Sequence, residues 1–250
     1  MHYITYKFTP LYDPLHGRHI TASGLHGLLF NIARQTDPKE ATWLHKHKSP
    51  RPFSLVPLYD QDGYLAGMRV ASITDRTTTL LHRSGEWFAT EGRNCHLGGR
   101  EFIIDSCRLS PAPNWSQLAL TQPAKEVGLN FISPTSFRQG PGNLPLPLPR
   151  NVFASPARIW QTFAPPMLAN IDNWLDWCEK DIFIQEHNIH TVTMAGNKHR
   201  SFTGFVGEVW YKAYKGDEQQ LAIWQALANL ATFCGIGQRT TMGMGAVERI

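Results

Sequence analysis

The chain has 250 residues, of which 42% are hydrophobic and 18% charged, so it can bury a substantial core and is not intrinsically disordered. No apolar run approaches the roughly 18 residues that span a bilayer, and the start of the chain lacks the pattern of a signal peptide, so we expect a cytoplasmic protein with no membrane partner. The formal net charge of +4, together with 11 histidines, is compatible with an anionic partner but does not require one. The four cysteines form no CxxC pair, and we expect them to be free thiols.

The first half of the chain predicts a strand, two helices, a hairpin, a helix and a strand. Residues 2–9 are β-branched and aromatic, as in a strand, and Ser23 can cap a helix whose apolar side chains recur every three or four residues. Residues 37–40, Asp-Pro-Lys-Glu, combine an N-cap, a first-turn proline and the glutamate of a capping box, so a second helix begins there and ends before Pro50. The remaining expected elements are strands over 53–59 and 64–73, a helix over 75–90 and a strand over 100–109. This βαββαβ order is that of a ferredoxin-like domain, which we expect at residues 1–112.

The second half of the chain predicts the same order of elements once more. A linker with three prolines is expected over 110–125. The elements expected after it are a strand over 127–137, an exposed loop over 140–149, a helical stretch over 156–180 broken at 165–166, hairpin strands over 182–194 and 201–214 around a turn at 195–198, a helix over 217–233 and a strand over 246–250. We therefore expect a second domain at residues 125–250. The predicted fold class is α+β, with tandem ferredoxin-like (RRM-like) βαββαβ domains.

The segment after the last predicted helix is rich in glycine. Residues 235–245 contain four glycines, more than the end of a helix requires. Glycine permits positive φ and exposes amides that can cradle phosphate, and Arg239 with two threonines adds donors. A flexible loop leading into the last strand is the plain alternative. The segment is neither a dinucleotide fingerprint, because it follows a helix, nor a Walker loop, because no Gly-Lys-Ser/Thr follows.

A second segment concentrates positive charge at the end of the second predicted helix. Five cationic or protonatable side chains fall within residues 45–51. The helix dipole stabilises an imidazolium at such an end, so a histidine there can act as acid and base near neutral pH. A solvated basic corner is the alternative. A zinc site through His45 and His47 is not favoured, because no cysteine lies at ligand spacing nearby.

Three segments together carry a recognisable pattern. The first runs from Gly24 through Asp37-Pro38 and Leu44-His45 to residues 50–54, the second is residues 131–137 (FISPTSF), and the third is residues 235–245 (GIGQRTTMGMG). They resemble the CRISPR-associated endoribonucleases that mature guide RNA, whose glycine-rich signature is GxGxxxxxGxG. The resemblance implies a nuclease without metal or cofactor that cuts precursor CRISPR RNA within each repeat, often at the base of a hairpin. Its implied partners are this RNA and a multi-subunit guide-RNA effector complex.

The resemblance also implies an active site. In this family a histidine after the first helical region acts with a nearby cation and a tyrosine. The histidine corresponds to His45 and the cation to Arg51, whereas the tyrosine position matches Phe30, which has no hydroxyl. Some members place the catalytic histidine in the first helix, which makes His26 a competitor.

The implied chemistry needs only these residue types. The ribose 2′-hydroxyl attacks its adjacent phosphate and leaves a 2′,3′-cyclic phosphate and a 5′-hydroxyl end. His45 would deprotonate the hydroxyl or protonate the departing 5′ oxygen, and Arg51 would stabilise charge on the phosphate. RNA contacts are expected from Lys46, Lys48, Gly235, Gly237, Arg239, Thr240, Gly243 and Gly245.

A non-catalytic RNA-binding subunit with two RRM-like domains is the alternative function. Residues 203–207 (TGFVG) resemble a fragment of an RNA-binding RRM strand, although Gly207 interrupts the aromatic alternation that stacks bases. Histidines and basic residues over 187–200 can contact RNA or form a solvated face. A fixed cleavage product from a repeat RNA would separate the two functions.

Overall fold

The computed structural model describes residues 1–166, 171–195 and 201–250, which form two compact units. Unit 1 contains Met1–Ala112, the described part of Met194–Phe202, and Thr241–Gly243. Unit 2 contains the described parts of Pro113–Thr193 and Thr203–Thr240, and Met244–Ile250. Thr241–Gly243 therefore belongs to unit 1, although the residues on either side of it belong to unit 2. None of the described helices is long and apolar enough to cross a membrane.

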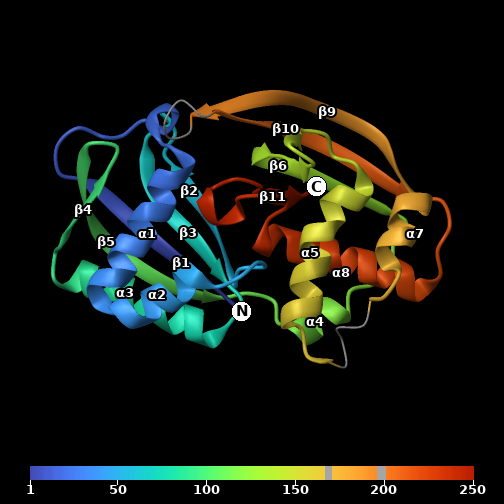
Figure 1. Cartoon of the computed structure of the whole chain (residues 1–250), viewed down its shortest axis with the longest axis horizontal. Helices are drawn as coiled ribbons and strands as arrows, with labels where there is room; N and C mark the ends of the chain where they lie inside the picture. Colours follow the sequence, from blue (N-terminus) through green and yellow to red (C-terminus); the bar gives the residue numbers. More distant parts are fainter. Residues whose placement is uncertain (167–170, 196–200) are drawn as a thin grey trace. The chain divides into compact units, whose positions relative to one another are not determined.

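Unit 1 is built around a five-stranded antiparallel sheet with the strand order β2-β3-β1-β5-β4. Its strands are β1 (His2–Pro10), β2 (Phe53–Tyr59), β3 (Leu65–Ser72), β4 (Asn94–Leu97) and β5 (Arg100–Pro111). Its helices are the 3₁₀ helix η1 (Gly17–His19) and the α-helices α1 (Ala22–Thr36), α2 (Pro38–Lys46) and α3 (Asp75–Thr90). The three α-helices lie on the same side of the sheet (Figure 1). Without the edge strand β4, this is the ferredoxin-like order predicted from the sequence.

Alternation along β1 shows which face of this sheet is buried. Ile4, Tyr6 and Phe8 are buried, whereas the residues between them are more exposed, as in a strand with one face packed on helices. The Tyr6 hydroxyl donates to the carbonyl oxygen of Leu81 in α3 at 2.7 Å, so this buried polar group is satisfied. Leu29 of α1 belongs to the same core. The helices that carry the candidate site are thus fixed on the sheet by apolar packing.

Asp37 joins α1 to α2. Its backbone N–H donates to the carbonyl oxygen of Ala33 at 2.8 Å, where α1 ends, and its Oδ1 accepts from the Glu40 N–H at 3.0 Å, where α2 begins. Pro38 occupies the first position of α2, where a missing N–H costs no hydrogen bond. The predicted start of this helix is confirmed. The Glu40 carboxylate, however, does not complete the expected capping box, because it pairs with Arg76.

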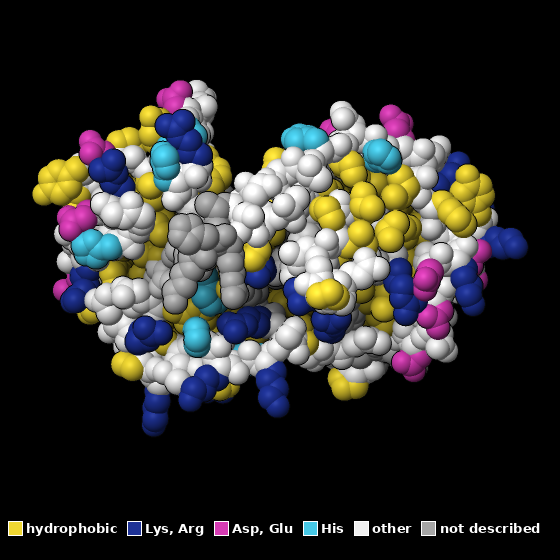
Figure 2. Space-filling model, turned by 45° about the horizontal axis from the view of Figure 1, so that its top comes forward, with side chains coloured by type: hydrophobic (Ala, Val, Ile, Leu, Met, Phe, Trp, Pro, Cys, Tyr) yellow, Lys and Arg dark blue, Asp and Glu magenta, His cyan; other side chains and the backbone are white. Residues whose placement is uncertain are grey.

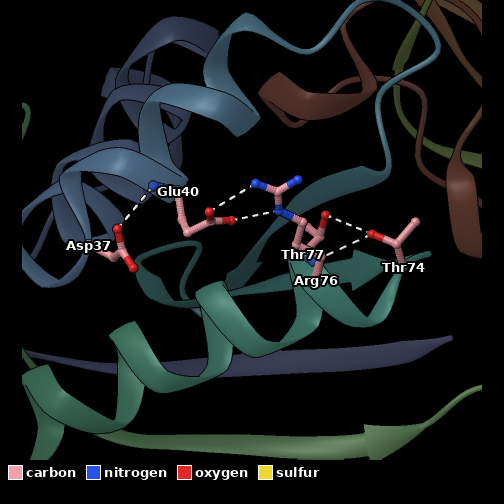
Figure 3. A network of polar contacts seen from close by, with 5 residues as sticks. All are labelled: Asp37, Glu40, Thr74, Arg76 and Thr77. Atoms are coloured by element: carbon pink, nitrogen blue, oxygen red, sulfur yellow. Dashed lines mark hydrogen bonds and ion pairs between the residues drawn. The ribbon is translucent and has the colours of Figure 1, made fainter.

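Arg76 of α3 holds α2 through two contacts. Its Nε and Nη2 donate to Glu40 Oε2 and Oε1 at 2.7 and 2.9 Å, and its guanidinium lies 3.7 Å from the centroid of the Trp43 ring. Figure 3 shows the ion pair between the two helix starts, which are capped by Asp37 and Thr74. Two parallel N–H···O bonds fix the relative orientation of both groups. The position of α2 on α3 therefore depends on Arg76.

Unit 2 contains a four-stranded sheet with the order β11-β6-β10-β9 and a separate small hairpin, β7-β8. Its strands are β6 (Glu126–Thr135), β7 (Phe137–Gln139), β8 (Gly142–Leu144), β9 (Ile182–Ala195), β10 (Ser201–Ala213) and β11 (Val247–Arg249). Its described helices are α4 (Trp115–Ala119), α5 (Pro149–Phe163), α7 (Trp174–Asp181) and α8 (Glu218–Cys234), and the 3₁₀ helix η2 (Thr240–Met242) follows α8. The order of the four-stranded sheet matches that of β5-β1-β3-β2 in unit 1. The predicted α+β class with two ferredoxin-like domains is confirmed.

Three glycines after α8 stand where backbone segments of unit 2 approach closely. Gly235, Gly237 and Gly245 have positive φ values of 74°, 82° and 74°. A Cβ at Gly245 would overlap the carbonyl oxygen of Ile236, and a Cβ at Gly237 would lie 2.5 Å from that of Ser136. Only glycine meets both requirements without strain.

Two helices begin at residues other than those predicted. Thr21, not Ser23, is the N-cap of α1, and its Oγ1 accepts from the Gly24 N–H at 3.1 Å. Helix α5 begins at Pro149, and Pro156, the predicted start, lies inside it. Serine and threonine are both favoured N-caps, and proline suits any first position, so the residue type alone did not identify the start.

Several elements form where none was predicted, among them α4, β4 and β8. The expected linker contains α4, which begins with a capping box between Asn114 and Gln117. The expected loop over 140–149 contains β8, and β4 pairs with β5 at the edge of unit 1. The turn predicted at 195–198 lies outside the described residues except for Ala195.

The four cysteines are free thiols, as predicted. Burial raises the pKa of the Cys95 thiol to about 11 and those of Cys107 and Cys234 to about 12. A thiol with such a pKa is protonated at neutral pH and is a poor nucleophile.

Gly245→Ala is expected to destabilise unit 2. Left-handed backbone costs an alanine about 1–2 kcal/mol, and the overlap with the Ile236 carbonyl adds about 1–3 kcal/mol because the backbone must shift. Gly140→Ala is the matched control, since Gly140 also has a positive φ of 53° but a Cβ there meets no described atom within 4 Å. Urea denaturation measures both variants, and equal losses of stability would show that the close approach contributes nothing.

Arg76→Ala is expected to loosen α2 while the rest of unit 1 stays folded. The variant loses the Glu40 pair and the Trp43 contact, so amide hydrogen exchange in α2 should accelerate several-fold while exchange in β1 stays unchanged. Arg76→Lys keeps the charge but not the two parallel hydrogen bonds, and we expect an intermediate effect. Unchanged exchange in α2 of both variants would contradict the assigned role.

Candidate active site

Helices α1 and α2 bring two histidines and a phenylalanine into contact. The ring centroids of His26 and Phe30 are 4.7 Å apart, those of Phe30 and His45 5.0 Å, and those of the two histidines 6.0 Å. Phe53, at the start of β2, lies with its ring centroid 6.5 Å from that of His26 in a stacked orientation. His26 and Phe30 share one face of α1 because they are four residues apart. The histidines that the sequence offered as alternatives are therefore neighbours.

A backbone carbonyl orients the ring of His26. Its Nδ1 lies 2.9 Å from the carbonyl oxygen of Thr241, which belongs to the same unit. A carbonyl oxygen only accepts, so Nδ1 carries the hydrogen and the neutral ring keeps its lone pair on Nε2. No sequence pattern identifies this partner, because a backbone oxygen is present at every residue.

The surroundings of His26 favour its neutral form. Burial lowers the pKa of His26 below its usual value of 6.5, the hydrogen bond to Thr241 opposes this, and the positive charges of Arg51 and His45 lower it further. A half-buried imidazole with a lowered pKa is unprotonated near neutral pH and can accept a proton at Nε2.

His45 occupies a different environment from His26. It lies in the last turn of α2 and is exposed to solvent. Unpaired carbonyl groups at a helix C-terminus carry partial negative charge. The two neighbouring rings therefore differ in their surroundings, because His26 is half-buried and His45 is exposed at a helix end.

Arg51 presents an unpaired donor beside the histidines. Its side chain is half-buried, and its Nη1 is buried without a hydrogen-bond partner among the described residues. Burial lowers the pKa of this guanidinium, although an arginine remains charged under all physiological conditions. A buried N–H of a charged group is costly when left unpaired, so an anion that reaches it gains a strong hydrogen bond.

Other basic residues extend this surface. Lys46 and Lys48 are exposed at the end of α2. In Figure 2, Lys, Arg and His side chains gather along the lower edge of unit 1, which is the left part of the view. We name the set of His26, His45 and Arg51 the histidine cluster. This cluster and the two lysines are suited to a polyanion.

The glycine-rich segment uses most of its amides within the chain. The N–H of Gly235 donates to Ala231 at 2.8 Å, that of Gly237 to Ser155 Oγ at 3.0 Å, and that of Gly245 to Pro134 at 3.1 Å. The expectation that these three amides are exposed to cradle phosphate is thus corrected, because they are already paired. Their contacts with RNA stay a prediction.

The rest of the segment is divided between the units. Arg239, with a φ of 63°, and Thr240 are half-buried in unit 2. Gly243 lies in unit 1, where an added Cβ would meet Pro57 Cδ at 3.2 Å and Leu25 Cδ1 at 3.6 Å. RNA contacts of these three residues also stay predictions.

The aromatic residue of the segment that resembles an RRM sequence is not available to stack on a base. Phe205 of β10 is buried in unit 2, and its ring centroid lies 4.6 Å from that of Phe131. A ring that packs in the core cannot stack on a base. The described residues also contain no group of three or more His, Cys, Asp or Glu side chains arranged to hold a metal ion.

Comparisons with known proteins find relatives of this chain both by sequence and by fold. A family model described as CRISPR-associated endoribonuclease Cas6 matches residues 129–247. A Cas6 product complex has a TM-score of 0.83 and 24% identity, covering 100% of this chain and 99% of that chain. A second Cas6 product complex has a TM-score of 0.80 and 22% identity, covering 100% of both chains. A Thermus thermophilus Cas6 has a TM-score of 0.75 and 21% identity, covering 100% of this chain and 98% of that chain.

No curated protein matches the chain. The three solved structures share its fold over both units, and at these identities the likeness concerns the fold alone. The family model adds a match in sequence from β6 to the last strand. The chain therefore has the Cas6 fold over its whole length, and residues 129–247 carry the sequence pattern of the CRISPR-associated endoribonuclease family Cas6, which confirms the resemblance predicted from the sequence.

Proposed function

We propose that the chain is an endoribonuclease that cuts CRISPR repeat RNA and leaves 2′,3′-cyclic phosphate and 5′-hydroxyl ends. The observation that carries this proposal is the histidine cluster, in which two imidazoles 6.0 Å apart accompany a guanidinium with an unpaired buried N–H. The family match and the shared fold with Cas6 product complexes supply the class of substrate.

The reaction needs a base, an acid and a group that stabilises negative charge. The substrate supplies the nucleophile, because the ribose 2′ oxygen attacks the adjacent phosphorus while the bond from phosphorus to the 5′ oxygen breaks. A base must take the proton of the 2′-hydroxyl, and an acid must give a proton to the 5′ oxygen. Two imidazoles of opposite protonation state can perform both transfers.

His26 is suited to the base and His45 to the acid. The lowered pKa of His26 and its hydrogen bond to Thr241 leave a proton acceptor at Nε2. His45 is exposed in the last turn of α2 and, as an imidazolium, can donate a proton to the leaving oxygen. Both histidines are then catalytic, and Phe30 contributes packing between their rings instead of a hydroxyl.

Arg51 stabilises the charge that develops on the phosphate. Its Nη1 has no hydrogen-bond partner among the described residues, so a phosphate oxygen that reaches it competes with no existing hydrogen bond. A donor already in place and desolvated is worth more to a transition state than one that must reorganise. Lys46 and Lys48 supply contacts to the backbone that do not depend on sequence.

The proposed partner is precursor CRISPR RNA. An effector complex as a further partner stays a prediction of the sequence. The competing function, a non-catalytic RNA-binding subunit, loses one of its arguments because Phe205 is buried.

His45→Ala and His26→Ala are each expected to slow single-turnover cleavage by roughly 10²-fold or more, while RNA affinity stays nearly unchanged. His96→Ala is the matched control, because His96 is exposed on β4 outside the cluster. A 2′-deoxy substitution at the cut site should abolish cleavage by every variant. A normal cleavage rate for His45→Ala would show that other groups perform the proton transfer assigned to His45.

The pH dependence tests the assignment of the base. A base acts only when unprotonated, so the rate should fall as the pH drops through the pKa of His26, which lies below 6.5. This acid limb should vanish in His26→Ala and persist in His45→Ala. If the fall in rate at low pH disappears in His45→Ala instead, then His45 is the base and His26 the acid.

Cleavage is expected to proceed in EDTA at the rate measured with magnesium present, because imidazoles and a guanidinium supply both proton transfer and charge stabilisation. The measurement is the single-turnover rate on a prefolded repeat RNA, with RNA structure checked in both buffers. Loss of cutting in EDTA that zinc or manganese restores, with RNA structure unchanged, would reject a metal-independent reaction.

A further inference from the structure

Unit 1 contains a polar hollow that none of the residues of the histidine cluster lines. Its volume is about 630 Å³. The chain between β1 and α1, the residue before β3 and the turn between β4 and β5 form its walls, and the polar lining includes Asp13, His16, Arg18, His19, Tyr64 and Arg100. No feature of the proposed reaction uses it.

The wall before α1 is held in place by the neighbouring hairpin. The Gly17 N–H donates to Gly63 at 2.9 Å, and the Leu65 N–H donates to Leu15 at 2.9 Å. The rings of His16 and Tyr64 meet edge to face at 5.2 Å. The polar side chains of this wall are therefore carried by a backbone tied to β3.

Positive charge dominates the lining. Asp13 is its single acidic member, and Asp13 Oδ2 accepts from Arg100 Nη1 at 2.9 Å. Arg18 is exposed, and its Nε donates to His19 Nε2 at 3.1 Å. No described carboxylate pairs with Arg18, so its charge is not neutralised among the described residues.

Two exposed tyrosines lie next to the chain segment that lines the hollow. Tyr12, next to Asp13 in the chain, is 81% exposed. Tyr59 is 45% exposed, and its ring lies against Gly17, 2.8 Å from where a Cβ would be. Cations that follow a nucleic-acid backbone, together with aromatic rings for its bases, are the combination that binds single strands.

The hollow adjoins the first turn of α1. Thr21 caps this helix two residues after His19, and Leu97, beside the Gly98 wall, would contact a Cβ at Gly24. His26 is five residues beyond Thr21, about 8 Å along the axis at 1.5 Å per residue. Gly24 and His26 are two residues apart and point to different sides of α1, so an RNA strand that contacts both the hollow and His26 must pass around the start of this helix.

We infer that this hollow binds the phosphates of a single-stranded segment of the substrate RNA that flanks the cut. Arg18 is its principal phosphate ligand, and the tyrosines stack on bases. The inference rests on the proposed function for the identity of the RNA, but binding to the hollow does not require that the chain cuts.

The test compares Arg18→Ala with Arg83→Ala, an exposed arginine on α3 that removes the same charge from unit 1. Binding to a repeat RNA with its unpaired flanks is measured over a series of salt concentrations. Arg18→Ala should weaken binding roughly tenfold, as expected for a hydrogen bond to a charged group, and lower the slope of log K against log salt by about 0.7 for one lost contact to a single strand. Arg83→Ala should change neither, and Arg18→Lys should restore most of the slope.

Two further measurements separate this inference from the proposed function. With an RNA trimmed to its hairpin, Arg18→Ala and the unaltered protein should bind equally. At saturating protein, Arg18→Ala should cut the full RNA at the normal rate. Equal affinities and slopes for Arg18→Ala and Arg83→Ala on the full RNA would overturn the inference and leave the cleavage proposal intact. The unaltered protein could instead bind the RNA without cutting it, and the proposed function would then be wrong. A salt dependence of binding that Arg18→Ala reduces would still support RNA binding in the hollow.

Discussion

The shared helix cap at Asp37 is the constraint on which the candidate site depends. One residue ends α1 with its N–H and begins α2 with its carboxylate, so the chain reverses without a loop between the helices. A longer connection would let α2 settle elsewhere on the sheet. With this cap in place, the end of α2 returns to the face of α1 that carries His26, and His45 meets it through Phe30.

The cluster assembled in this way is electrostatically incomplete. The charges that act on His26 are both positive, and a neighbouring guanidinium keeps a buried N–H without a partner. Such repulsion costs stability in the free protein, and it is relieved when an anion binds. An anion bound at the cluster would therefore remove a destabilising repulsion as well as form new contacts. The same positive charges lower the pKa of His26.

The βαββαβ order of both units was predictable from the sequence because its strong signals are local, whereas the additional elements β4, α4 and β8 were not predicted. The Asp-Pro-Lys-Glu segment marked the start of α2, and the apolar face of the last helix marked α8. The sequence did not identify Thr21 as the cap of α1 or Pro149 as the start of α5, since several neighbouring residues suited each role. It also left His26 and His45 as rivals, because their contact is tertiary and appears in no spacing along the chain. The unusual density of glycines was visible in the sequence. Glycine is required at position 245 because the carbonyl oxygen of Ile236 packs against it, and this contact is visible only in the folded structure.

The hydrogen bond between His26 and Thr241 also has a consequence for biosynthesis. A ribosome makes the helix that carries His26 more than two hundred residues before it makes Thr241, because these residues are 215 positions apart. While the chain is being made, most of unit 1 can fold, but the imidazole lacks the acceptor that selects its tautomer. In the nascent protein the two histidine rings can therefore be in contact before the hydrogen bond that orients His26 exists. That hydrogen bond can form only after nearly all of unit 2 has been synthesised.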